Sequence, residues 1–177
     1  MLLILVRHAR AVPRGRWEGP DVDRPLDSKG RRQSVALAER IGDLLATEPP
    51  PLVLSSPTLR CVSTVSPLAK RFGIPVRTDD RLLEADLVQA RDLPPGGATS
   101  GWLAERLAGV VGDALAAGSD KSGVVICTHG DVLPAGVAHL FDEVDAETAA
   151  ERNAKGGFWV VEIDDGRYSA AEYVRPS

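Results

Sequence analysis

Cysteine is scarce in this chain of 177 residues, which has only Cys61 and Cys127. The two stand far apart, in neither a CxxC nor a His-rich spacing, so a disulfide framework and a zinc knuckle are not expected. We expect both cysteines to be small, buried apolar groups. Aromatic residues make up 5% of the chain and hydrophobic residues 44%, a composition typical of globular proteins.

Long apolar runs are also lacking, because none approaches the roughly 20 residues that a membrane-spanning helix needs. The apolar stretch at residues 2–6 has no basic region before it and no small-residue cleavage site after it, so a signal peptide is not expected. The sequence shows no internal repeat, no low-complexity segment and no composition break. It predicts one domain over residues 1–177, no membrane association and a cytoplasmic location.

A broad excess of positive charge is absent as well, since the formal net charge is −4. Basic residues are nevertheless concentrated near the start, with nine Lys and Arg against five Asp and Glu between Arg7 and Arg40. Part of that excess is the solvated face of a helix. A locally basic region on an acidic protein suits a small anionic ligand better than nucleic acid, which binds a broad basic face.

Strand and helix patterns alternate along the first three-quarters of the chain. Short apolar runs predict strands at residues 2–6, 52–54, 74–76 and 123–127. Helical patterns are found at residues 28–45, 57–72, 99–117 and 131–140. Residues 158–163 and 167–174, joined by a turn at 164–166, predict a hairpin. The expected fold is a three-layer α/β/α sandwich with a mostly parallel central sheet and an antiparallel C-terminal edge hairpin.

Local signals set the expected limits of these elements. Ser28 is the expected N-cap of the first helix, which ends at the prolines of residues 49–51. The apolar stripe of that helix is expected to comprise Val35, Ala38, Ile41, Leu44 and Leu45. Pro67 is expected to kink or shorten the second helix.

Two predicted strands are each followed directly by a histidine, His8 and His129. The carboxyl ends of parallel strands are where open α/β sheets bind ligands. With Arg7 and with Arg60, on the second helix, these histidines would form a cationic pocket suited to phosphate, because a guanidinium group grips two phosphoryl oxygens. A neutral imidazole is a competent nucleophile near pH 7. Phosphoryl transfer through a histidine is the chemistry that this group of residues indicates.

Other candidates have more ordinary explanations. His139 lies on a predicted helix near apolar residues and is expected to be structural. Trp17 lies in a loop of residues 13–25, where it either stacks on a base or, more often, packs the loop against the body of the protein. A catalytic metal is not expected, because His8 and His129 lack the carboxylate or third nitrogen that such a metal usually needs.

The pattern resembles the histidine phosphatase superfamily, the phosphoglycerate-mutase-like proteins. The resemblance is carried by Arg7-His8-Ala9, Ser56-Pro57 with Arg60 and Thr64, Leu83-Glu84, and Thr128-His129-Gly130, and it covers nearly the whole chain. Asp23-Arg24-Pro25-Leu26 followed by Lys29-Gly30-Arg31-Arg32-Gln33 is most similar to the SixA-type phosphohistidine phosphatases and to the phosphatase domain behind some MutT-type Nudix domains. No Nudix box is present in this sequence.

The resemblance implies a metal-independent phosphatase without a cofactor. His8 would accept the phosphoryl group, Arg7, Arg60 and His129 would hold it, and Glu84 would protonate the leaving group. A carboxyl group must itself be protonated for that role, and Asp86 is the alternative donor; a phosphoramidate leaving group needs no strong acid.

The sequence departs from the family pattern at Ala9, where glycine is usual, and in the residues that mutases use for substrate contact. The span from Glu84 to Thr99 is too short for a large lid, so we expect an open pocket rimmed by Arg10, Arg14 and Arg16. Such a pocket suits a phosphohistidine protein or a nucleotide.

Two alternatives stay open: a nucleotide di- or triphosphate phosphohydrolase of the same fold, and a phosphate-binding module without turnover. The presence of both histidines and both arginines disfavours the second. The sequence makes no prediction of oligomeric state.

Overall fold

A mixed sheet with strand order β3-β2-β4-β1-β5-β6 forms the centre of the computed structural model, which describes residues 1–45, 51–97, 99–117, 121–164 and 167–176. β1 pairs in parallel with β4, and β2 pairs in parallel with both β4 and β3. β5 and β6 run antiparallel and join the sheet through β1, which confirms the predicted hairpin. The strands are Leu2–Arg7 (β1), Leu52–Ser55 (β2), Arg77–Thr78 (β3), Gly123–Thr128 (β4), Phe158–Asp164 (β5) and Arg167–Val174 (β6).

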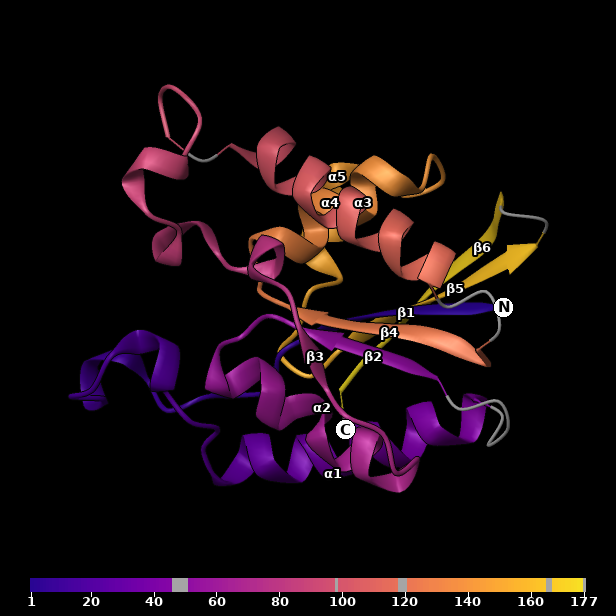
Figure 1. The fold of residues 1–177 in the computed structure, drawn as a ribbon, viewed down its shortest axis with the longest axis horizontal. Helices are drawn as coiled ribbons and strands as arrows, with labels where there is room; N and C mark the ends of the chain where they lie inside the picture. The colour runs from indigo at the N-terminus through magenta and orange to yellow at the C-terminus, as the bar shows by residue number, and fades with distance from the viewer. Residues whose placement is uncertain (46–50, 98, 118–120, 165–166, 177) are drawn as a thin grey trace.

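Helices cover both faces of the sheet, so the three-layer prediction is confirmed (Figure 1). One face carries α1 (Ser28–Leu44) and α2 (Leu59–Arg71). The other carries α3 (Ser100–Ala117), α4 (Val132–Leu140) and α5 (Ala146–Glu151). The short helix α5 was not predicted; Asp145 caps it by accepting a hydrogen bond from the Thr148 N–H at 2.7 Å. Within the described ranges, every helix is too short or too polar to span a membrane.

β1 is apolar from Leu2 to Val6 because both of its faces are buried there. Leu3 and Leu5 pack into the cluster formed with α3 and α4, whereas Ile4 and Val6 pack into the cluster formed with α1 and α2. Successive side chains of a strand point to opposite faces, so a central strand needs apolar residues at every position. Cys61 and Cys127 are both buried in the second cluster, as expected.

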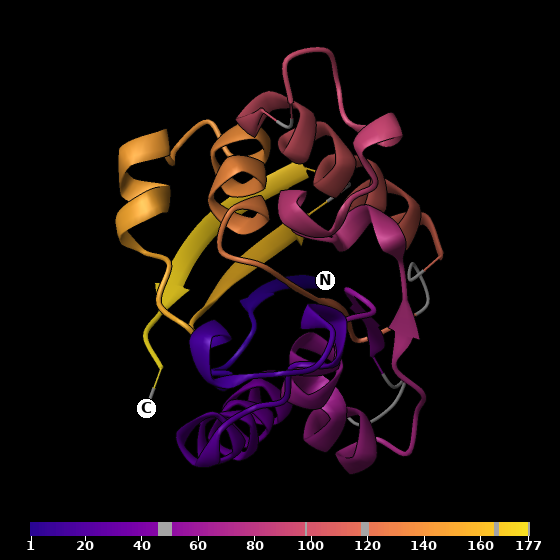
Figure 2. The same cartoon turned by 90° about the vertical axis from the view of Figure 1, so that its left-hand side faces the viewer.

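The register of β1 against β4 brings their carboxyl ends together. Arg7 pairs with Thr128 in the ladder, and the His8 N–H donates to the Thr128 carbonyl at 3.0 Å. The residues that follow the two strands therefore emerge side by side. Figure 2 views this edge of the sheet, where the segment after β1, the turns after β3 and the loop from β4 to α4 meet.

Three element limits differ from the predictions. The N-cap of α1 is Asp27, not Ser28, and its carboxylate accepts from the Gly30 N–H at 2.8 Å. The predicted strand at residues 74–76 is wrong, because the ladder to β2 begins at Arg77; Pro75 has no N–H to donate to a ladder. α2 begins at Leu59 and continues through Pro67 to Arg71, so the proline does not end it.

The buried face of α1 also differs from the predicted stripe. Val35 and Leu44 are about half exposed, whereas Gln33 and Ser34 are buried beside Leu37. Gln33 is buried because backbone groups of other segments satisfy its amide, a pairing that hydrophobic periodicity does not detect. The predicted end of this helix near Leu45 agrees with α1, which ends at Leu44. Two of the prolines that follow it, at residues 49–50, and residues 165–166 of the predicted turn lie outside the described residues.

Candidate active site

His8 follows β1 directly and has one ring nitrogen free. Its Nδ1 lies 2.8 Å from the carbonyl oxygen of Ala9, which only accepts, so Nδ1 carries the proton and Nε2 keeps its lone pair. The Ala9 N–H donates to Thr64 Oγ1 at 2.9 Å, which fixes the backbone at this turn. Burial lowers the pKa of His8 to about 4, and the charges of His129 and Arg60 act in the same direction. His8 is therefore a neutral imidazole at neutral pH.

His129 follows β4 and is fully buried beside His8, with the two ring centroids 5.4 Å apart. Its Nε2 lies 2.8 Å from Ser56 Oγ, which comes from the end of β2. Its Nδ1 lies 3.8 Å from a carboxylate oxygen of Glu84. The ring thus lies between the end of β2 and the turns after β3.

Arg60 lies in the first turn of α2 and is also fully buried. Its Nη1 donates to the carbonyl oxygen of Asp21 at 2.7 Å, and its Nη2 pairs with the Asp21 carboxylate at 3.1 Å. The same Nη2 donates to Glu84. Arg60 thereby links the segment after β1 to the turns after β3.

Arg7 completes the group of residues that we call the floor: Arg7, His8, Arg60 and His129. Its guanidinium lies against the backbone of Gly130, where a Cβ atom would overlap it, and it donates to the carbonyl of Asn153. Three nitrogens of the floor are buried and have no hydrogen-bond partner among the residues that the structure describes: Nε of Arg7, Nε of Arg60 and Nδ1 of His129. An unsatisfied buried polar group is costly, and phosphoryl oxygens would satisfy these nitrogens.

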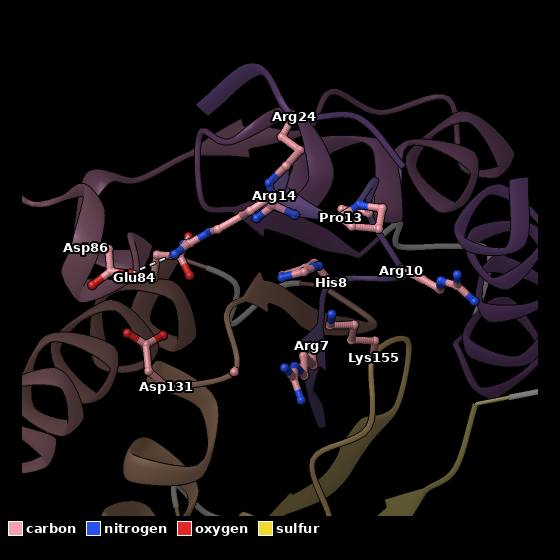
Figure 3. Close-up of a pocket in the computed structure, with 12 residues that line it drawn as sticks. Arg7, His8, Arg10, Pro13, Arg14, Arg24, Glu84, Asp86, Asp131 and Lys155 are labelled. Carbon is pink, nitrogen blue, oxygen red and sulfur yellow. Dashed lines mark hydrogen bonds and ion pairs between the residues drawn. The ribbon is translucent and has the colours of Figure 1, made fainter. Parts of the chain in front are cut away.

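A cavity of roughly 650 Å³ lies over the floor, a volume suited to a small-molecule ligand. Figure 3 shows His8 between two groups of side chains. One group holds Glu84, Asp86 and Asp131 together with the guanidinium of Arg14, and the other holds Arg7, Arg10 and Lys155. The residues that line the cavity are Arg7, His8, Arg10, Ala11, Pro13, Arg14, Arg24, Glu84, Asp86, Gly130, Asp131 and Lys155.

We call Arg10, Arg14, Asp86 and Lys155 the rim of this cavity. Arg14 spans its mouth, because its guanidinium pairs with Glu84 at 3.0 Å, with Asp86 at 2.9 Å and with Asp21 at 3.3 Å. Glu84 therefore accepts from both Arg14 and Arg60. It must be released from these partners and protonated before it can act as an acid.

The structure brings most of the predicted residues together. Arg7, His8, Arg60, His129 and Glu84 meet at one place, and Arg10, Arg14 and Asp86 line the cavity above them. Arg16 does not join them: it is exposed and is not among the residues that line the cavity. His139 is exposed at the end of α4, and the half-buried Trp17 donates its indole N–H to Pro20 of its own loop.

Ser56 and Arg24 are among the residues that carry the family resemblance, but no role was predicted for them, and Asp21, Asp131 and Lys155 were not predicted as site residues. Asp21 and Ser56 hold Arg60 and His129, while Arg24, Asp131 and Lys155 line the cavity. Asp131 had a signal, since it lies two residues after His129. No pattern in the sequence connects Lys155 or Asp21 to the site, because folding alone brings them there.

No group of three or more His, Cys, Asp or Glu side chains that could hold a metal ion occurs in the part of the chain that the structure describes.

Comparison with known proteins places this geometry in a family. The model of the histidine phosphatase superfamily (branch 1) matches residues 3–95, which include His8, Arg60 and Glu84 but not His129. An 8-oxo-(d)GTP phosphatase of Mycolicibacterium smegmatis is 29% identical over 98% of this chain, which spans 48% of that relative. A glucosyl-3-phosphoglycerate phosphatase of Mycolicibacterium vanbaalenii is 31% identical, with 78% of this chain and 73% of the relative covered.

Solved structures share the fold. A mycobacterial glucosyl-3-phosphoglycerate phosphatase in complex with VO3 has a TM-score of 0.71 at 24% identity, covering 95% of this chain and 96% of the other. The putative phosphohistidine phosphatase SixA of Agrobacterium tumefaciens has a TM-score of 0.67 at 22% identity, covering 99% and 98%. At these identities the likeness concerns the fold, whereas the family model matches the sequence itself. The chain belongs to the histidine phosphatase superfamily.

Proposed function

We propose that this chain is a phosphatase that hydrolyses a phosphomonoester or a phosphoramidate through a phosphohistidine on His8. The observation that carries the proposal is the state of His8: a neutral ring whose Nδ1 proton is bound to Ala9, at the floor of a cavity. A nucleophilic nitrogen needs a free lone pair, and Nε2 has one. Arg7 lines the same cavity, and Arg60 and His129 lie buried next to His8. As donors, these groups would stabilise phosphoryl oxygens.

The reaction proceeds in two steps. In the first, Nε2 of His8 attacks phosphorus, and the bond from phosphorus to the leaving group breaks with its electron pair. The leaving group takes a proton from Glu84, from Asp86 or from water. In the second, a water oxygen attacks phosphorus and passes a proton to the group that gave one in the first step, Glu84, Asp86 or water. The bond to Nε2 breaks with its electron pair, and phosphate leaves while His8 returns to its neutral form. Positively charged side chains stabilise the phosphoryl oxygens in both steps.

Rapid quenching tests the nucleophile. Incubation with radiolabelled p-nitrophenyl phosphate should leave an acid-labile, base-stable label on the wild-type protein and on His139→Ala, whose histidine is exposed on α4. His8→Ala should carry no label and should lose turnover. Label on His8→Ala would exclude His8 as the nucleophile, and absence of turnover in the wild type would support a phosphate-binding module. A chelator should leave the rate unchanged, since the arginines supply the positive charge.

The substrate class is the second part of the proposal. A protein phosphohistidine fits an open cavity and a leaving group that needs no strong acid. A nucleotide is the alternative, and the name of the Mycolicibacterium smegmatis relative, which matches 98% of this chain, favours it. A side-by-side screen of a phosphohistidine protein, nucleoside di- and triphosphates and sugar phosphates separates these classes. A cytoplasmic location is part of the same proposal and rests on the sequence.

A further inference from the structure

Lys155 is a cation of the cavity to which the reaction at His8 assigns no role. It lies one residue before Gly156, whose N–H donates to the carbonyls of Arg7 and His8 at 3.1 and 3.2 Å. Gly156 has a φ of 82°, a backbone conformation that favours glycine. The backbone at Lys155 is therefore attached to the strand end that carries the nucleophile, and Figure 3 shows the lysine side chain extending into the cavity near His8 and Arg7.

The buried amide of Gln33 fixes the segments that carry Lys155 and Arg10. Its Nε2 donates to the carbonyl of Lys155 at 3.0 Å, and its Oε1 accepts from the N–H of Arg10 at 3.0 Å. The Arg10 backbone also packs so closely on Gly30 that a Cβ atom there would overlap the Arg10 carbonyl. The backbones of Lys155 and Arg10 are thus fixed on either side of Gln33, while their side chains are exposed to solvent.

The charges around Lys155 are unevenly compensated. Arg10 pairs with Asp27 at 2.7 Å, and Arg24 pairs with Asp21 at 2.7 Å. The ammonium group of Lys155 has no hydrogen bond or ion pair to any residue that the structure describes. Partial burial lowers its pKa, and the charges of Arg7, Arg24 and Arg10 lower it further. An anion bound between these cations would relieve their repulsion.

The opposite side of the cavity carries Glu84, Asp86 and Asp131, and its cation Arg14 is already paired with Glu84 and Asp86, at 3.0 and 2.9 Å. A substrate whose phosphoryl group lies on the floor would therefore direct any further negative charge toward Lys155. The two sides of the cavity thus differ, because the side of Lys155 attracts a second anion more strongly than the side of Glu84.

We propose that Lys155, flanked by Arg10 and positioned by Gln33, forms a second anion-binding subsite that selects substrates with a phosphate or carboxylate group next to the phosphoryl group that is removed. This inference rests on the proposed phosphatase activity at His8 and specifies its substrate class. Phosphate and carboxylate share the chemistry that an ammonium and a guanidinium recognise, and the test separates them.

The test compares two matched pairs of substrates. Adenosine diphosphate and adenosine monophosphate differ by an added phosphate, while 2-phosphoglycolate and ethyl phosphate differ by a carboxylate in place of a methyl group. Each substrate is assayed with the wild type, Lys155→Gln, Lys155→Arg and the control Lys70→Gln, whose lysine is exposed in the last turn of α2. Differences in leaving group cancel, because each variant is compared with the wild type on the same substrate.

Lys155→Gln should lower kcat/KM roughly tenfold for the member of a pair that carries the second anion and less than about threefold for its partner. Lys155→Arg should restore most of the loss, and Lys70→Gln should change neither. A selective loss in the diphosphate pair identifies phosphate as the ligand, and one in the glycolate pair identifies carboxylate. An equal loss for both members of each pair, or no loss, overturns the subsite.

A separate readout distinguishes failure of this inference from failure of the proposed function. Wild type and Lys155→Gln should both hydrolyse p-nitrophenyl phosphate and carry the phosphohistidine label on His8. If the label forms but the pairs do not respond to Lys155, the subsite is wrong and the phosphatase stands. If no label forms and no substrate is hydrolysed, both proposals are wrong.

Discussion

The floor and the rim of the cavity are built by different means. Each floor residue stands at the end of a strand or in the first turn of a helix, and Arg60 is fully buried. The rim residues come from loops and turns, and the side chain of Arg14 is 52% exposed. Buried side chains on regular elements are held by packing on several sides, whereas loop side chains depend on a few ion pairs in contact with solvent.

This difference separates the chemistry from the choice of substrate. A floor that packing holds rigid can keep a nucleophile and its phosphate-binding donors in one arrangement. A rim made of loops can vary without disturbing that arrangement. We therefore expect substitutions on the floor to affect every substrate and substitutions on the rim to affect some substrates more than others.

The largest effect is expected from Arg60→Lys. Lysine keeps the charge but loses the planar fork that reaches Asp21, Glu84 and the phosphoryl oxygens, so kcat/KM should fall about a hundredfold for every substrate. Steady-state kinetics with p-nitrophenyl phosphate measures the loss, and Arg16→Lys, at an exposed position outside the cavity, is the matched control. A loss below threefold would show that the Arg60 guanidinium does not hold the phosphoryl group.

A smaller effect concerns stability and comes from His8. Its pKa is about 4 in the folded protein and about 6.5 in the unfolded chain, so between these values the unfolded chain binds a proton that the folded protein does not. The contribution of the neutral His8 to the free energy of unfolding is fully present above pH 6.5, and it is lost as the pH falls toward 4. From pH 7 to pH 5 the free energy of unfolding should decrease by about 2 kcal/mol through this residue.

Urea unfolding at both pH values measures this change. His8→Gln should lose about 2 kcal/mol less than the wild type over the same interval. His139→Gln is the control, because its exposed ring should leave the interval unchanged. If His8→Gln and the wild type showed the same pH dependence, the pKa of His8 would not be lowered by folding. The claim that His8 is neutral because it is buried would then be wrong.

The smallest effect is expected from Arg14→Gln on the rim. Its ion pairs with Glu84, Asp86 and Asp21 are in contact with solvent, and such pairs stabilise a protein by less than about 1 kcal/mol. Thermal unfolding should change little, and kcat/KM for p-nitrophenyl phosphate should stay within about threefold. A loss as large as that of Arg60→Lys would show that floor and rim form one functional unit.

The sequence predicted the floor because its members follow directly from strand and helix patterns. Two apolar strands are each followed by a histidine, and parallel strands bring their carboxyl ends to one edge of the sheet. The sequence alone therefore predicts that His8 and His129 lie close together. Arg60 followed from the helix that begins after Ser55-Ser56-Pro57. Glu84, which the family resemblance named as the proton donor, contacts Arg60 and His129, and its role stays a prediction.

The rest of the site could not be predicted, because its contacts join segments that no local pattern connects. Asp21 meets Arg60 across 39 positions of the sequence, and Gln33 meets Lys155 across 122. Gln33 also explains why the predicted buried face of α1 was wrong. This polar residue is buried because its amide has two backbone partners, whereas a prediction from apolar residues places it on the exposed face. Hydrophobic periodicity shows which apolar side chains gain from burial, and it does not detect polar side chains that are buried because they are hydrogen-bonded.

The segment between β1 and α1 lines the cavity and closes on itself beside it. Val12 N–H donates to the carbonyl of Pro25 at 2.9 Å, Asp27 N–H donates to that of Arg10 at 3.1 Å, and Ala11 bridges to Leu26. Because these contacts close the loop at its base, the loop can be exchanged as a unit. Transplanting residues 12–25 from another member of the superfamily should carry over a new mouth for the cavity without rebuilding the sheet, provided that the incoming loop keeps an aspartate to hold Arg60.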